Sequence, residues 1–127
     1  MPTRLPNDTV IFNATPHPLN FWDSETAKVT VARPDTVINT RPVESIEGCW
    51  NGIDFVNVTY NPEEKGLKLI DNIRLEYPDI IIVGSVLAAM AYPGEIVASI
   101  PIKGKDRLRS KTSSRRVCQD RFTIFNS

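Results

Sequence analysis

The chain has 127 residues, of which 41% are hydrophobic and 24% are charged. These values are typical of a single domain, residues 1–127, with an ordinary core. Fifteen Lys and Arg residues balance fifteen Asp and Glu residues, so the formal net charge is zero. A molecule-wide field is therefore excluded as the driving force for binding long nucleic acid or a membrane, and any electrostatic function must come from local clustering.

The N-terminus and the hydropathy predict a cytoplasmic protein without a membrane segment. No apolar run follows a basic N-terminus, and the longest apolar stretch, around residues 80–83, is too short to span a bilayer. Cys49 and Cys118 could form one disulfide, but two isolated thiols in such a chain are more simply reduced. One histidine and the lack of a CxxC pair argue against a zinc site, so no metal or cofactor is expected.

Short strands are expected throughout, because ten prolines divide the chain too densely for a long helix. Residues 10–13 and 19–22 are β-compatible runs, separated by a stiff corner that contains Pro16 and Pro18. Residues 28–32 alternate polar and apolar side chains, which predicts a further strand.

A hairpin is predicted next, with Asn51-Gly52 as its two-residue turn between residues 47–50 and 53–60. In the following segment, between Pro62 and Pro78, the apolar spacing fits a helical face only in part. The sequence favours neither a helix nor an irregular edge strand for this segment.

Residues 80–83 form a continuous β-branched run, as expected of a strand covered on both faces. Gly84-Ser85 then opens a short helix over residues 86–91, and Ser85 is expected as its N-cap rather than as part of a phosphate-binding turn. Residues 95–100 and 121–125 read as strands. The order predicts an α+β fold: a mainly antiparallel sheet, a short C-terminal βαβ-like unit and one or two short helices.

The charge is distributed unevenly along the chain. Residues 103–121 hold eight cations against Asp106 and Asp120, which is 8 − 2 = +6, so the remainder carries 7 − 13 = −6. Glycine, serine and threonine lie between these cations, a combination suited to phosphate oxygens. The equally weighted alternative is that residues 103–116 form a solvated basic loop, and Asp120 could pair with a neighbouring arginine.

Polar and aromatic residues also gather near the first corner. Asn13, Thr15, His17, Asn20 and Trp22 offer amide, hydroxyl, imidazole and indole groups that could bind a ribose or stack on a base. A histidine between prolines is more often structural than functional.

The remaining aromatic residues divide into two groups. The phenylalanines alternate within predicted strands and are expected in the core, namely Phe12, Phe21, Phe55, Phe122 and Phe125. Trp22, Trp50 and Tyr92 are then the candidates for an exposed stacking surface.

Signatures of catalysis are weak. The sequence contains neither GxSxG nor HExxH, and no cysteine lies close in sequence to His17. No catalytic residue is therefore assigned, and ligand binding is favoured over an enzymatic reaction.

Two short motifs carry a resemblance to a known family. Residues 11–20, read as φ-N-x-T-P-H-x-φ, resemble the opening of a group of small phage-encoded proteins, and residues 81–85 and 115–122 correspond to their later strand and arginine-containing stretch. The chain is most similar in length, element order and these motifs to the phage Thoeris anti-defence family, first type. Its members sequester cyclic ADP-ribose signals made by TIR-domain immune enzymes.

This resemblance implies a non-catalytic, α+β homo-oligomer without a cofactor, whose nucleotide pockets lie partly between subunits. Some members also bind cyclic oligonucleotides at separate sites. The motif matches and the basic and aromatic features together give these candidate ligand-binding residues: Asn13, Thr15, His17, Trp22, Arg109, Arg115, Arg116, Asp120 and Arg121. Two alternatives remain: a small nucleotide-processing enzyme, and a virion or host-protein interaction module with a basic docking loop.

Overall fold

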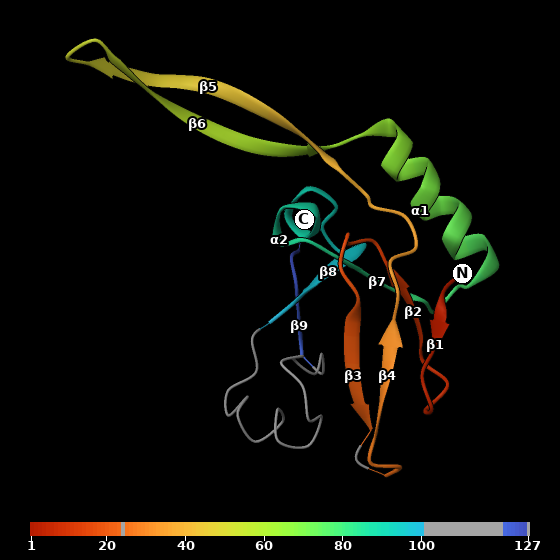
Figure 1. Ribbon diagram of the computed structural model, residues 1–127. Helices are drawn as coiled ribbons and strands as arrows, with labels where there is room; N and C mark the ends of the chain where they lie inside the picture. Colours follow the sequence, from red (N-terminus) through yellow and green to blue (C-terminus); the bar gives the residue numbers. More distant parts are fainter. Residues whose placement is uncertain (24, 101–120, 127) are drawn as a thin grey trace.

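The computed structural model describes residues 1–23, 25–100 and 121–126, and it has the predicted α+β fold (Figure 1). At its centre is a five-stranded mixed sheet with the order β1-β2-β7-β8-β9. The strands of this sheet are β1 (Thr3–Arg4), β2 (Val10–Asn13), β7 (Ile81–Gly84), β8 (Ile96–Ser99) and β9 (Phe122–Ile124). The inner strands β2, β7 and β8 are parallel, and the outer strands β1 and β9 pair antiparallel with them.

The sheet is covered on both faces. Two helices, α1 (Glu64–Glu76) and α2 (Val86–Ala91), bury one face, and a hairpin of β3 (Leu19–Asp23) and β4 (Lys28–Ala32) packs on the other. Alternate residues of β7 therefore enter different cores: Ile82 lies in the helix-side cluster and Val83 in the hairpin-side cluster. This confirms the prediction that residues 80–83 are a strand covered on both faces.

The predicted βαβ-like unit is β7, α2 and β8. The Ser85 hydroxyl accepts a hydrogen bond from the Ala88 amide at 3.1 Å, which confirms Ser85 as the N-cap of α2. At the adjoining end of β7, Gly84 lies so close to Ile96 that a Cβ atom would approach its side chain to 2.7 Å. The glycine thus allows α2 to fold back closely on the sheet.

The segment left open between helix and strand is the helix α1, which buries Ile70 and Ile73 against the sheet. Arg74 fixes its C-terminal end. The Arg74 Nε donates to the Glu95 carboxylate at 2.8 Å, and its terminal nitrogens donate to the main-chain oxygens of Ile80 and Glu95, each at 3.1 Å. One side chain thereby ties α1 to the turns before β7 and β8.

The predicted Asn51-Gly52 hairpin is confirmed, with φ angles of 51° and 77° at its two turn residues. Its strands, β5 (Thr40–Trp50) and β6 (Ile53–Pro62), are longer than predicted and form a two-stranded ribbon that projects from the body (Figure 1). We refer to residues 40–62 as the arm. The register shifts between Ile46 and Gly48, so that Glu47 is an extra residue in β5.

Two aromatic predictions are wrong. Phe55 was expected in the core, but it lies on the arm and is 52% exposed. Tyr92 was expected to offer an exposed stacking surface, but it follows α2 and is 2% exposed. Strand alternation marks one side of a ribbon without showing whether that side meets a core, and this caused the first error.

Tyr92 anchors the base of the arm. Its hydroxyl donates to the Asn39 carbonyl at 2.8 Å and accepts from the Glu63 amide at 2.9 Å, so it bridges the residues that flank the arm. Gly66 of α1 packs directly against the Tyr92 hydroxyl, where no side chain would fit. Both ends of the arm are thereby fixed to the body.

The basic loop, residues 103–116, lies outside the described residues, and the single-domain assignment remains a prediction. Cys49 is exposed on the arm, and Cys118 lies outside the described part. None of the helices formed by the described residues has the length and apolar character needed to cross a bilayer.

The two hydrogen bonds of the Tyr92 hydroxyl predict that Tyr92→Phe lowers the stability of the protein. This change removes one donor and one acceptor from a buried position and leaves the Asn39 and Glu63 main-chain groups unpaired. The free energy of unfolding should fall by about 1–3 kcal/mol in urea titrations. Tyr60→Phe is the control, because no hydrogen bond of the Tyr60 hydroxyl occurs among the described residues. Equal effects of the two changes would contradict the assigned role.

Candidate functional site

The N-x-T-P-H motif forms a closed hydrogen-bonded corner at the end of β2. Asn13 is fully buried. Its side-chain nitrogen donates to the carbonyls of His17 and Ala32 at 2.7 and 2.8 Å, and its side-chain oxygen accepts from the amide and hydroxyl of Thr15 at 3.0 and 2.6 Å. The Asn13 amide group therefore has protein partners for both donors and for its acceptor.

The other motif residues complete the same corner. The Thr15 hydroxyl oxygen also lies 2.9 Å from the His17 carbonyl, so its single proton is shared between this carbonyl and the Asn13 side-chain oxygen, and the contribution of His17 to the corner comes from its main chain. The His17 side chain is exposed. The main-chain amide of Asn13 donates to the Asp35 carboxylate at 2.8 Å, which fixes the chain just beyond β4. The geometry gives Asn13 and Thr15 an architectural task and leaves the imidazole accessible.

Trp22 is separated from the other first-corner candidates. It lies five residues beyond His17, near the far end of β3, which corresponds to about 17 Å of extended chain. There Trp22 lines a small cavity of about 60 Å³, together with Leu5, Pro6, Asn7, Phe21 and Asp23. The proximity predicted within the first corner therefore holds for Asn13, Thr15 and His17 but does not include Trp22.

Of the candidates from the arginine-containing stretch, Arg121 is described. It is exposed and directly precedes β9, where its carbonyl accepts a hydrogen bond from the Ile100 amide at 3.0 Å. Phe122 contacts Phe21, with ring centroids 6.2 Å apart, so the start of β9 packs on the strand that carries Trp22. Arg109, Arg115, Arg116 and Asp120 lie outside the described residues, and their assignment stays a prediction.

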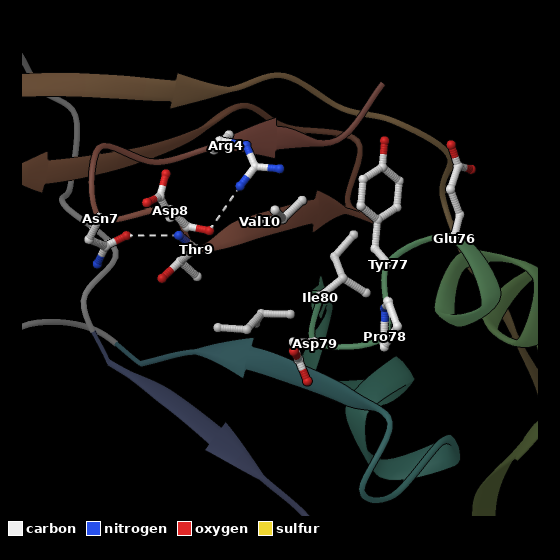
Figure 2. A pocket seen from close by; sticks show the side chains of 11 residues that line it. Arg4, Asn7, Asp8, Thr9, Val10, Glu76, Tyr77, Pro78, Asp79 and Ile80 are labelled. Atoms are coloured by element: carbon white, nitrogen blue, oxygen red, sulfur yellow. Dashed lines mark hydrogen bonds between the residues drawn. The ribbon is translucent and has the colours of Figure 1, made fainter.

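A larger cavity, of about 510 Å³, opens between the β1–β2 turn and the connection from α1 to β7 (Figure 2). Its volume is in the range of small-molecule sites. The lining residues are Arg4, Asn7, Asp8, Thr9, Val10, Glu76, Tyr77, Pro78, Asp79, Ile80 and Ile81. We call this space the turn cavity.

The β1–β2 turn forms one wall of the turn cavity and is held by its own hydrogen bonds. The Arg4 guanidinium donates to the Asp8 carbonyl at 3.3 Å, and the Asn7 side-chain oxygen accepts from the Thr9 amide at 3.1 Å (Figure 2). Asp8 adopts a positive φ of 68°, a conformation that aspartate tolerates better than most residues.

The opposite wall supplies an aromatic ring and two carboxylates. Figure 2 shows Tyr77, Glu76 and Asp79 on the chain that leads from α1 to β7. Together with Asp8 these make three carboxylates against the single guanidinium of Arg4, a formal balance of 1 − 3 = −2. A ligand with hydroxyl groups and an aromatic ring suits such a cavity, whereas the negative charge of the cavity would repel a phosphate group.

The sequence predicts strands that include some turn-cavity residues, but it predicts none of these residues as part of a site. The cavity joins residues 4–10 to residues 76–81, which meet because β2 and β7 pair in parallel across a long separation in the chain. The local signals were Asn7-Asp8, a turn-forming pair, and Pro78, which ends the segment of α1. Neither signal predicts that the two segments lie side by side.

No group of three or more potential metal-ligating side chains occurs in the described ranges. Comparison of the chain with protein-family models, curated proteins and solved structures finds no match. The functional argument therefore depends on the motifs and on the geometry of this chain.

The closed corner predicts opposite outcomes for two motif residues. Asn13→Ala leaves two carbonyls and the Thr15 groups without their buried partner, so the free energy of unfolding should fall by at least about 2 kcal/mol. His17→Ala keeps the main-chain carbonyl and should change stability by less than about 0.5 kcal/mol. Urea unfolding measures both. A large loss for His17→Ala would show that the imidazole itself supports the fold.

Proposed function

We propose that the protein binds and sequesters a cyclic ADP-ribose-type nucleotide without altering it, acting as a homo-oligomer in the cytoplasm of a phage-infected host cell. The proposal combines the resemblance of the N-x-T-P-H opening to the phage Thoeris anti-defence family with the chemistry of the turn cavity. The observation that carries it is the cavity of about 510 Å³, in which an aromatic ring and carboxylates line one concave surface.

Each part of such a ligand has a different chemical requirement. An adenine base can stack on the Tyr77 ring, and the ribose hydroxyls can donate to the carboxylates of Asp8, Glu76 and Asp79. Neutral, hydroxyl-rich groups do not suffer the repulsion that the negative balance of the cavity imposes on phosphate. The turn cavity therefore supports recognition of the nucleoside part.

The pyrophosphate needs positive charge that the turn cavity supplies at Arg4 alone among its lining residues. The sequence concentrates a formal charge of +6 in residues 103–121. In this proposal Arg109, Arg115, Arg116 and Arg121 contact the phosphates, because guanidinium groups form paired, charge-assisted hydrogen bonds with phosphate oxygens. Arg121, the described member of this group, is exposed, but it lies at the carboxyl ends of the parallel strands, whereas the turn cavity lies at their amino ends. In this proposal the arginines therefore reach the phosphates from a second subunit.

The direct test separates sequestration from catalysis. The purified protein is incubated with cyclic ADP-ribose isomers and removed by filtration, and bound material is released by heat and analysed by chromatography. Depletion followed by recovery of the intact nucleotide supports the proposal. Recovery of an altered nucleotide would favour an enzyme. If the nucleotide is not depleted and does not raise the melting temperature, an interaction module is favoured instead. For a protein that binds the nucleotide, a nucleotide concentration 100 times the dissociation constant should raise the free energy of unfolding by about 2.7 kcal/mol.

Tyr77→Leu should weaken binding of the nucleotide by about 1–3 kcal/mol, because it keeps an apolar side chain but removes the stacking surface. Isothermal titration calorimetry measures the change. Leu75→Ala is the control, since Leu75 is exposed in the last turn of α1, two residues before Tyr77, and does not line the cavity. Unchanged affinity of a folded Tyr77→Leu variant would remove the turn cavity from the proposal.

Arg116→Ala should weaken binding by about 1.5–3 kcal/mol if its guanidinium bonds to phosphate. Arg33→Ala, which removes an exposed cation elsewhere, is the matched control. The same titration in added salt distinguishes a direct contact from general attraction, because a direct contact is less sensitive to screening. Equal losses for the two variants would show that total charge alone determines the affinity.

A further inference from the structure

The arm carries an apolar surface that the described part of the chain leaves uncovered. Its large apolar side chains are between 36% and 71% exposed. They are Val43, Ile46, Trp50, Ile53, Phe55, Val56 and Val58. Such a concentration on one two-stranded element is unusual for a monomer, since large contiguous apolar patches mark interaction surfaces.

The strand register divides these side chains between two faces of the arm. Trp50 pairs with Ile53, and Phe55 and Val43 lie on the same face by alternation; this outer face also carries Arg41 at the base of the arm. The inner face holds Ile46, Val56 and Val58. It also includes Tyr60, which packs against the core of the body.

We propose that the outer face is a self-association surface, on which the arm of a second copy of this chain packs face to face and antiparallel. The contact is isologous, because the same residues are used by both copies. It gives the homo-oligomer of the proposed function a specific interface, and it does not depend on nucleotide binding.

The size of the outer face agrees with that of a stable dimer. Val43, Trp50, Ile53 and Phe55 are about half exposed on average. At ~200 Å² for a fully exposed large side chain, they present on the order of 450 Å² of apolar surface per copy. Apolar atoms make up a little over half of a typical interface, so this corresponds to about 800 Å² per partner, the standard size.

The antiparallel arrangement also makes the outer face self-complementary. With the two-fold axis at the Ser45–Asn57 pair, counting along the register places Trp50 over Arg41 of the second copy. An indole below a guanidinium is a favourable cation–π contact. The same count places Val43 of the second copy over Gly48, where the missing side chain leaves open space beside Phe55.

The inner face lacks this complementarity. It carries Glu44, opposite Val58, and Asp54, opposite Cys49, on either side of its apolar centre. An antiparallel self-contact about Ile46 and Val56, counted in the same way, would place Glu44 over Cys49 of the second copy and Asp54 over Val58, so that both carboxylates would be buried without a cation beside them. Charge therefore selects the outer face for association between identical chains.

Two adjacent residues on opposite faces test the interface. Sedimentation equilibrium of the full chain, without nucleotide, should show a dimer at micromolar concentration. Phe55→Glu should weaken dimerisation at least about 100-fold, because it places a carboxylate in the buried contact. Val56→Glu introduces the same charge on the inner face and should leave the dimer intact. Circular dichroism checks that both variants are folded.

Cross-linking tests the position of the two-fold axis independently. In a chain with Cys49→Ser and Cys118→Ser, the change Ser45→Cys places a thiol from each copy near the axis, on packed ribbons whose backbones are about 10 Å apart. A short bismaleimide should join the copies in high yield. Ile46→Cys, which is on the inner face, is the matched control and should give little cross-linked dimer.

Each result supports or overturns the interface. Dimerisation that is lost in Phe55→Glu and kept in Val56→Glu supports it. The interface would be overturned by a wild-type chain that is still monomeric at about 100 μM. A dimer that is broken by Val56→Glu alone would also overturn it. An oligomer that sequesters the nucleotide and is unaffected by Phe55→Glu would reject this interface while leaving the proposed function in place, and a dimer that is lost in Phe55→Glu but has no nucleotide affinity would do the reverse.

Discussion

The hydroxyl of Tyr92 is the contact on which the arrangement of the molecule depends. It binds the Asn39 carbonyl and the Glu63 amide, the two points where the chain leaves and re-enters the body, and Gly66 makes room for it in α1. Tyr92 itself follows α2 and is buried in the core cluster on the helix side of the sheet. A single buried phenol thus connects the core, the helix α1 and the base of the arm, so the exposed ribbon has a fixed point of attachment.

Local signals predicted the elements well. Asn51-Gly52 specified the turn of the arm because both positions need a positive φ, and Ser85 specified the start of α2 because its hydroxyl caps a free amide. The β-branched run at residues 80–83 indicated burial on both faces. Each of these features depends on a few neighbouring residues, which is why the α+β class could be predicted from the sequence.

Contacts between segments that lie far apart in the sequence could not be predicted from such local signals. Phe55 and Ile82 both occur in alternating or apolar strand patterns, yet Phe55 is on the arm and Ile82 is in the core. The turn cavity needs β2 beside β7, a pairing that no local pattern encodes. The N-x-T-P-H motif predicts ligand contacts, while the structure gives Asn13 and Thr15 internal partners. Of the candidates beyond this motif, Trp22 lies on β3 and Arg121 directly precedes β9, two strands that contact through Phe21 and Phe122.

Both ends of the arm are attached to the body at the same place, so the length of the arm can change without a change in the body. Because Asn39 and Glu63 are bridged at the base, an insertion of one residue in β5 and one in β6 would extend the ribbon by about 3.3 Å, and two in each would restore the original face. A variant with a longer or shorter ribbon would keep the same body, and in the proposed dimer it would change the distance between the two bodies. The ribbon would then act as a molecular spacer.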